Sequence, residues 1–151
     1  RTPGVILEDS NIELKAFTGI QKLQGDIHTN VTSYNAHVLV LGQVPSEEIK
    51  STITAQIKAL ANVKSVMNEL TIEPVNSLSA KAEDTLITSS VKARFFKENK
   101  VSPFYVKVIT ENKVVYLMGL LNEKEAKEAE EIAKNTNKVT KVVKLFETIK
   151  N

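Results

Sequence analysis

The residues of this chain that could carry out chemistry do not form a recognisable catalytic set. His28 and His37 would flank one hairpin turn, and no third metal ligand lies at a suitable spacing from them. The chain contains no cysteine, which excludes thiol nucleophiles and zinc–thiolate sites. Nucleophile elbows, phosphate-binding loops and dinucleotide-binding glycine motifs are also missing from the sequence. We therefore expect a protein that binds a partner, with no catalytic residue, metal or cofactor.

Glutamates are dense between Glu123 and Glu131, where paired carboxylates could in principle serve acid–base chemistry. Lysines lie among them at helical spacing, for example Lys127 four residues after Glu123. Opposite charges at this separation are typical of a solvated helix surface. We interpret the run as an exposed helix face and not as a catalytic site.

Charge is distributed unevenly along the chain. Residues 1–76 carry six basic and eight acidic side chains, whereas residues 77–151 carry 14 basic and 10 acidic ones. A basic second half favours an anionic partner, and solvated surface lysines are the alternative. Nucleic acid is not expected, because Tyr105 and Tyr116 alone would have to form the stacking platform on the strands of that half.

A candidate binding surface lies on a helix that we predict to begin at Asp84. At about 100° per residue, Ile87, Val91 and Phe95 fall on one side and would be buried. The opposite sector combines apolar, small and basic side chains, and a solvated face would not need the apolar ones. Apolar side chains can enter a bilayer while lysines meet anionic headgroups, so this sector is predicted to bind lipid. The members of this predicted lipid-binding set are Leu86, Ser89, Ser90, Ala93, Phe96, Lys97 and Lys100. Packing of Leu86 and Phe96 inside the protein is the alternative.

The elements that must position this surface occur twice along the chain. Each copy has an apolar run that includes a glycine, at 38–45 and 115–122, then a charged helix-prone stretch and a β-branched run. Residues 31–35 align with 108–112, and Asp9 aligns with Asp84. Each copy predicts helix, strand, strand, helix, strand. The expected fold is α+β, with two helices packed on one face of a small three-stranded mixed sheet and the opposite face free to be polar.

The expected boundaries follow from caps, turns and linker composition. Asp9 or Ser10 would cap the first helix, Ser46 the second, Asp84 the third, and Asn122 the fourth with Glu125 as its capping-box partner. Strands are predicted at 27–33, 37–43, 63–73, 105–110, 114–120 and 139–149. We expect a flexible lead-in at 1–7, a first domain at 8–75, a linker at 76–81 and a second domain at 82–151.

The two copies differ on the face of their first helix that points away from the core. The corresponding sector of the first copy holds Asn11, Leu14, Thr18, Gln21 and Lys22, which is more polar than the sector of the second copy. Because both copies keep the same core pattern, this divergence indicates where function lies.

The order of elements and the position of Gly42 and Gly119 resemble the BON domain family. The stretches 30–34, 41–43 and 116–120 fit its hairpin pattern, and 122–126 fits the start of its second helix. The opening Arg1-Thr2-Pro3-Gly4 resembles the segment that follows the lipidated cysteine of dual BON-domain outer-membrane lipoproteins of Gram-negative bacteria.

This resemblance implies a location and a partner. The protein would lie on the periplasmic side of the outer membrane, anchored by a lipid on a cysteine that is absent from this chain. It would help to maintain outer-membrane integrity, and its second BON domain would bind anionic phospholipid through the helix predicted at Asp84. The alternative is a periplasmic scaffold that binds an outer-membrane or other envelope protein, with lipid contact incidental.

Overall fold

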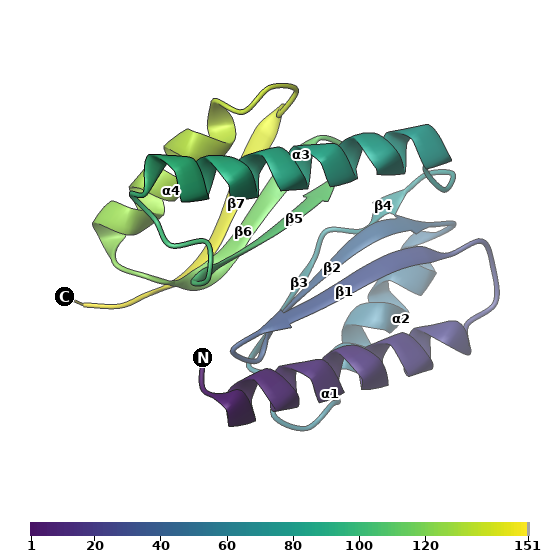
Figure 1. The fold of residues 1–151 in the computed structure, drawn as a ribbon. Helices are drawn as coiled ribbons and strands as arrows, with labels where there is room; N and C mark the ends of the chain where they lie inside the picture. The colour runs from purple at the N-terminus through teal and green to yellow at the C-terminus, as the bar shows by residue number, and fades with distance from the viewer. Residues whose placement is uncertain (151) are drawn as a thin grey trace. The chain divides into compact units, whose positions relative to one another are not determined.

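The computed structural model describes residues 1–150 as two units of one architecture (Figure 1). The N-terminal unit ends at Val75 and contains α1 (Pro3–Gln21), β1 (His28–Tyr34), β2 (His37–Val44), α2 (Glu47–Lys58), β3 (Ser65–Asn68) and β4 (Thr71–Ile72). The C-terminal unit contains α3 (Leu78–Glu98), β5 (Val106–Glu111), β6 (Val114–Leu121), α4 (Glu123–Lys134) and β7 (Lys141–Thr148). The predicted α+β tandem is confirmed.

Each unit is built around a mixed sheet whose central strand is the second strand of the hairpin. Strand β2 pairs antiparallel with β1 and parallel with β3 and β4. Strand β6 pairs antiparallel with β5 and parallel with β7. The predicted third strand of the N-terminal unit is split into β3 and β4, because Leu70 turns inward to a position with 1% exposure.

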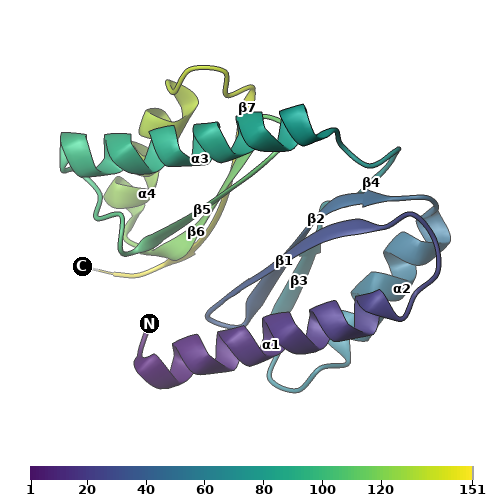
Figure 2. The same cartoon turned by 45° about the vertical axis from the view of Figure 1, so that its right-hand side comes forward.

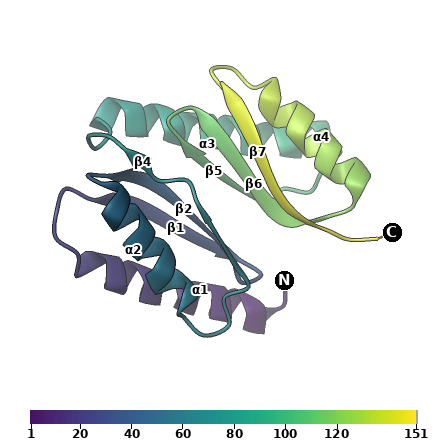
Figure 3. The ribbon, with the colours of Figure 1, turned by 180° about the vertical axis from the view of Figure 1, so that it is seen from behind.

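The two helices of each unit lie on the same face of its sheet (Figures 2 and 3). In the N-terminal unit, Ile12 and Ile20 of α1 and Ile53 of α2 pack against Val38 and Val40 of β2. In the C-terminal unit, residues of α3 and α4 pack against alternate positions of β5 and β6. That core is formed by Ile87, Val91, Phe95, Val101, Val106, Val108, Val115, Leu117, Leu121, Ala129, Ile132 and Ala133.

The opposite face of each sheet is not polar at its centre, so this expectation is wrong. Leu39 and Leu41 occupy the alternate positions of β2, and Tyr116 and Met118 occupy those of β6. All four side chains are buried. The central strands are continuous apolar runs, which are typical of strands buried on both faces.

Two helices begin earlier than predicted. Thr2 caps α1, its hydroxyl accepting from Val5 N at 3.2 Å, and Pro3 occupies the first helical position. Residues 3–7 are therefore helical and not a flexible lead-in. Ser77 caps α3 inside the predicted linker, accepting from Ala80 N at 3.1 Å. Asp9 and Asp84 are not helix caps.

The two other predicted caps are confirmed. The Ser46 hydroxyl accepts from Ile49 N at the start of α2. Asn122 and Glu125 form a reciprocal capping box at the start of α4.

Gly42 and Gly119 stand where neighbouring backbone approaches β2 and β6 too closely for a side chain. A Cβ at these positions would collide with the carbonyl oxygen of His28 or Tyr105, respectively. We expect Gly42→Ala and Gly119→Ala each to lower the free energy of unfolding by about 2–3 kcal/mol, because the adjacent strand must move.

The matched control for these variants is Gly4→Ala in α1. The nearest atom to a Cβ there is Thr2 Oγ1 at 3.9 Å, so no loss of stability is expected. Urea unfolding measures all three variants. Equal stabilities of Gly119→Ala and Gly4→Ala would contradict the steric argument.

Candidate membrane-binding surface

A buried carboxylate fixes α3 to the hairpin of the C-terminal unit. Asp84 is 6% exposed, and its two oxygens accept from Asn112 N at 2.7 Å and Lys113 N at 2.8 Å. Both turn residues have positive φ, 52° and 66°, as a tight hairpin turn requires. The carboxylate therefore stabilises the turn and orients the helix at the same time.

The N-terminal unit repeats this arrangement with Asp9, which is 2% exposed. Its carboxylate accepts from Asn35 N at 2.7 Å, from Ala36 N at 2.8 Å and from Ser33 Oγ at 2.8 Å. Asn35 and Ala36 again have positive φ, 51° and 67°. We call this pairing of a helix carboxylate with two turn amides the aspartate brace.

Arg1 adds a cation to the brace of the N-terminal unit. Its guanidinium donates to Asp9 Oδ2 at 2.9 Å and lies 4.1 Å from the centre of the Tyr34 ring. Burial by itself would raise the pKa of Asp9, but hydrogen bonds from Ala36, Ser33, Arg1 and Asn35 outweigh it and hold the pKa below its usual value. Burial raises the pKa of Tyr34, and Arg1 opposes that rise.

Because Asp84 and the core residues of α3 point inward, the opposite side of the helix faces outward. Leu86 is 68% exposed and Phe96 is 74% exposed. Ser89, Ser90, Ala93 and Lys97 are exposed as well. Thus six of the seven predicted lipid-binding residues lie on the exposed side of α3.

Lys100, the seventh predicted residue, lies beyond the helix. Helix α3 ends at Glu98, and Asn99 adopts the left-handed conformation with φ of 53° while its N–H bonds to Phe95 O. The side chain of Lys100 is exposed and lines a groove between the end of α3 and α4.

Sequence reasoning missed Leu78, the most N-terminal member of the exposed side. At about 100° per residue it shares the sector of Leu86 and Phe96, and it is 85% exposed. The sequence signal for an earlier helix start was Ser77, which is a good N-cap. The Ser- and Pro-containing residues around Ser77 led to the prediction of a linker there. We define the α3 outer face as Leu78, Leu86, Ser89, Ser90, Lys92, Ala93, Phe96 and Lys97.

The acidic side chains of α3 are engaged within their own unit. Asp84 is buried in the brace, and Glu98 pairs with Arg94 at 2.9 Å. Glu83 lies 3.6 Å from Lys113 Nζ and 3.8 Å from Lys138 Nζ. The α3 outer face therefore presents large apolar side chains together with positive charge and no carboxylate.

The corresponding side of α1 also exposes large apolar side chains. Ile6, Leu7, Leu14 and Phe17 are 45%, 64%, 64% and 47% exposed, and we call them the α1 outer face. The outward side of α1 is therefore more apolar than predicted, because the helix was predicted to begin after Ile6 and Leu7. Asn11, Thr18, Gln21 and Lys22 of the predicted sector are exposed as well.

Comparison with known proteins assigns both units. The profile of the BON domain matches residues 9–74 and residues 83–150, which together form most of the chain. The chain belongs to the BON domain family. Each match spans one brace, from its aspartate to the end of the third strand, so the predicted tandem of BON domains is confirmed.

Two curated relatives share this tandem over nearly the whole chain. Outer membrane lipoprotein DolP of Haemophilus influenzae is 36% identical over 97% of this chain and 77% of its own length. The 21 kDa hemolysin of Actinobacillus pleuropneumoniae is 29% identical over the same shares. A solved structure, the C-terminal domain of CdsD from the type III secretion system of Chlamydia trachomatis, covers 91% of this chain and 96% of its own at 12% identity, with a TM-score of 0.38.

Residues 1–150 contain neither a membrane-spanning helix nor a metal-binding cluster. No helix in that range has the length and apolarity needed to cross a membrane. No three histidine or acidic side chains of the same range gather into a group that could hold a metal ion. His37 Nδ1 instead lies 2.6 Å from Ser65 Oγ.

The brace predicts a specific loss of stability in each BON domain. We expect Asp9→Asn and Asp84→Asn to lower the free energy of unfolding by about 2–4 kcal/mol, because two turn amides lose a charged acceptor. Asp26→Asn is the control, since Asp26 is exposed. Hydrogen exchange at the Asn35 and Asn112 amides reports each domain separately, and unchanged protection at both would contradict the role of the brace.

The lowered pKa of Asp9 also predicts a loss of stability at low pH. A carboxyl whose pKa is lowered by folding contributes its full stability above the unfolded pKa, about 4, and loses it as the pH falls through the folded pKa. Wild-type protein should therefore lose protection at Asn35 below about pH 4, and Asp9→Asn should flatten that part of the profile. Parallel profiles for the two proteins would count against this assignment.

Proposed function

We propose that this chain is a non-enzymatic envelope protein that binds anionic phospholipid through the α3 outer face and helps to maintain outer-membrane integrity. Its similarity to an outer membrane lipoprotein supports a location on the periplasmic side of the outer membrane. By analogy with that lipoprotein, a lipid anchor would be attached to a cysteine outside this sequence, because this sequence contains no cysteine.

The observation that carries this proposal is the composition of the α3 outer face. Leu78, Leu86 and Phe96 are 85%, 68% and 74% exposed, and burying each would contribute about 1.5–3 kcal/mol if desolvation is complete. Each lysine near a charged bilayer surface contributes about 1 kcal/mol more. The sum supports reversible binding of a helix that lies in the interface, strengthened by an anchor.

Substitutions on this face test the proposal directly. We expect Leu86→Glu and Phe96→Glu each to reduce binding to phosphatidylglycerol-containing vesicles about tenfold or more, because a carboxylate replaces buried apolar area and meets like charge. Leu14→Glu is the matched control, with the same substitution at a similarly exposed position of α1. Co-sedimentation measures binding, and circular dichroism confirms folding.

Two further readouts distinguish insertion of apolar side chains into the bilayer from electrostatic attraction to its surface. Binding should require anionic lipid and weaken as salt screens the lysines. Because the chain has no tryptophan, Phe96→Trp and Leu14→Trp each give a single reporter. Fluorescence of the first should shift to the blue on vesicles, and that of the second should not. If Leu86→Glu and Phe96→Glu both bind vesicles as tightly as the wild-type protein, the proposal is contradicted.

The α1 outer face favours a second function, the binding of an envelope protein partner. It exposes four large apolar side chains along one helix. Exposed apolar patches of this kind are typical of protein interaction sites. The first BON domain would then face a partner while the second faces the membrane.

Photo-crosslinking in the envelope tests the second function. A crosslinker at position 14 should capture one defined protein, whereas one at Lys58, an exposed position of α2, should not. Leu7→Glu should abolish the capture from position 14, because it places a charge beside the same apolar surface. Identical products from positions 14 and 58 would rule this function out.

A further inference from the structure

Two neighbouring aromatic side chains are exposed on the loop that joins α3 to β5. Phe104 is 87% exposed, the largest exposed fraction of any large apolar side chain among residues 1–150, and Tyr105 is 57% exposed. Neither belongs to the core of the C-terminal unit or to the α3 outer face. We call residues 102–105 the aromatic loop. Adjacent apolar rings exposed in this way are typical of a surface that binds a partner.

The backbone of the aromatic loop is held in a defined shape. Val101 and Val106, which flank it, are 2% and 6% exposed and belong to the core. Between these two anchors, Tyr105 N donates to Ser102 O at 3.1 Å and Phe104 N donates to Ser102 Oγ at 3.3 Å. These bonds close a tight turn that carries the two rings. The exposure of the rings is therefore a consequence of how the domain folds.

The aromatic loop lies on the same side of the domain as Phe96. The sheet order β5-β6-β7 puts the loop, which leads into β5, at the edge away from β7. The Thr88 hydroxyl of α3 donates to Thr110 Oγ1 of β5 at 2.7 Å, which identifies the side of the helix that adjoins this edge. Lys92 and Phe96 follow Thr88 at a spacing of four, each turned about 40° further from the core. Phe96 thus faces outward on the β5 side of α3.

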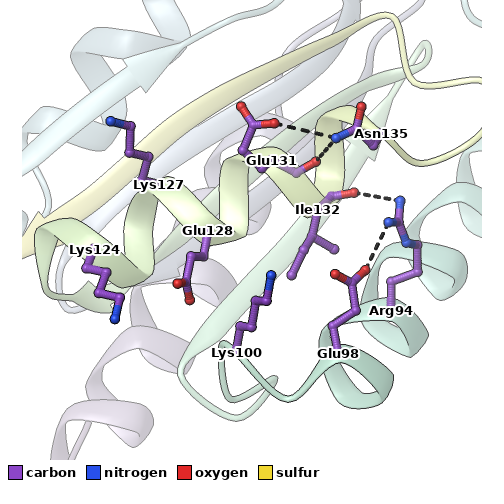
Figure 4. A pocket seen from close by; sticks show the side chains of 9 residues that line it. All are labelled: Arg94, Glu98, Lys100, Lys124, Lys127, Glu128, Glu131, Ile132 and Asn135. Carbon is purple, nitrogen blue, oxygen red and sulfur yellow. Dashed lines mark hydrogen bonds and ion pairs between the residues drawn. The ribbon is translucent and has the colours of Figure 1, made fainter.

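Helix α4 packs on the other side of α3. Figure 4 shows Arg94 of α3 turned toward α4, where its guanidinium donates to Ile132 O at 3.0 Å and pairs with Glu98 at 2.9 Å. In Figures 1 and 3 the loop runs from the end of α3 to the start of β5, at the edge of the sheet away from β7. The packing of α4 therefore leaves the β5 side of the domain, with Phe96 and the aromatic loop, uncovered by that helix.

We propose that the aromatic loop is a second insertion point of the second BON domain, which enters the interface of an anionic bilayer together with the α3 outer face. The inference rests on the proposed function and extends it from one helix face to a loop. Phenylalanine supplies apolar area, and tyrosine adds a polar hydroxyl, a combination that suits the boundary between acyl chains and headgroups. The sequence has no carboxylate side chain between Glu98 and Glu111, so the loop itself adds no charge that anionic lipid would repel.

The first BON domain lacks this feature at the corresponding place. Its loop between α1 and β1, residues 22–27, contains no exposed large apolar side chain and carries the exposed Asp26. Leu23 and Ile27 of that loop are half-buried and pack against the core. The two repeats therefore differ at this loop in the direction that membrane insertion by the second domain requires.

The first experiment measures binding of the full chain to vesicles of phosphatidylethanolamine and phosphatidylglycerol by co-sedimentation. We expect Phe104→Ser/Tyr105→Ser to weaken binding about tenfold or more, because two rings no longer enter the interface. The matched control is Leu7→Ser/Leu14→Ser, which removes two side chains of α1 that are each 64% exposed and should leave the affinity unchanged. Circular dichroism confirms that both variants fold.

The second experiment places a single tryptophan at the loop, because the chain has none of its own. On vesicles whose lipids carry bromine on their acyl chains, Phe104→Trp fluorescence should be quenched. Phe96→Trp reports on the α3 outer face in the same way. Gln24→Trp is the control, since Gln24 is exposed on the corresponding loop of the first BON domain and should not be quenched.

The outcomes separate the two proposals. Quenching at positions 96 and 104 but not at 24, together with weaker binding by Phe104→Ser/Tyr105→Ser, supports the insertion of both elements. Quenching at 96 without quenching at 104, or wild-type affinity of the double serine variant, would overturn the role of the aromatic loop while the proposed function stands. Failure of the wild-type protein to bind these vesicles would overturn the proposed function, and the loop assignment with it.

Discussion

The arrangement of each BON domain depends on one carboxylate that bonds to the two amides of a hairpin turn. Asp9 and Asp84 each lie within their helix and satisfy backbone N–H groups of residues with positive φ. Ala36 and Lys113 occupy turn positions that favour glycine, asparagine or aspartate, so the carboxylate offsets an unfavourable backbone. The same contact sets the rotation of the helix, and the rotation decides which side chains face outward.

Because the rotation of the helix about its axis is fixed, residues on its outward side can be substituted without changing the packing of the core. In α1 that side carries Leu7, Leu14 and Phe17, whereas in α3 it carries Leu86 and Phe96 together with Lys92 and Lys97. The carboxylates of α3 are used for internal purposes, in the brace and in pairs with Arg94, Lys113 and Lys138. Lys92 and Lys97 therefore have no carboxylate among the other members of the outer face.

The sequence predicted the fold because periodicity and turn signals occur twice and agree. It also predicted the core side of α3, and therefore the exposure of Leu86 and Phe96, since helix geometry converts spacing into direction. It failed at the starts of α1 and α3 for a chemical reason. An aspartate near a helix start is a common acceptor of backbone N–H groups, and Asp84 does accept two of them. Nothing local in the sequence says that these amides belong to a turn 28 residues away.

The groove was beyond sequence reasoning because it joins elements that are distant in the chain. Lys100 and Lys124 become neighbours of one cavity only after α4 has packed beside α3. Arg94 contributes to that packing, because its guanidinium donates to the carbonyl of Ile132 and also pairs with Glu98. The stability of the helix pair and the electrostatics of the groove are consequences of the same contacts.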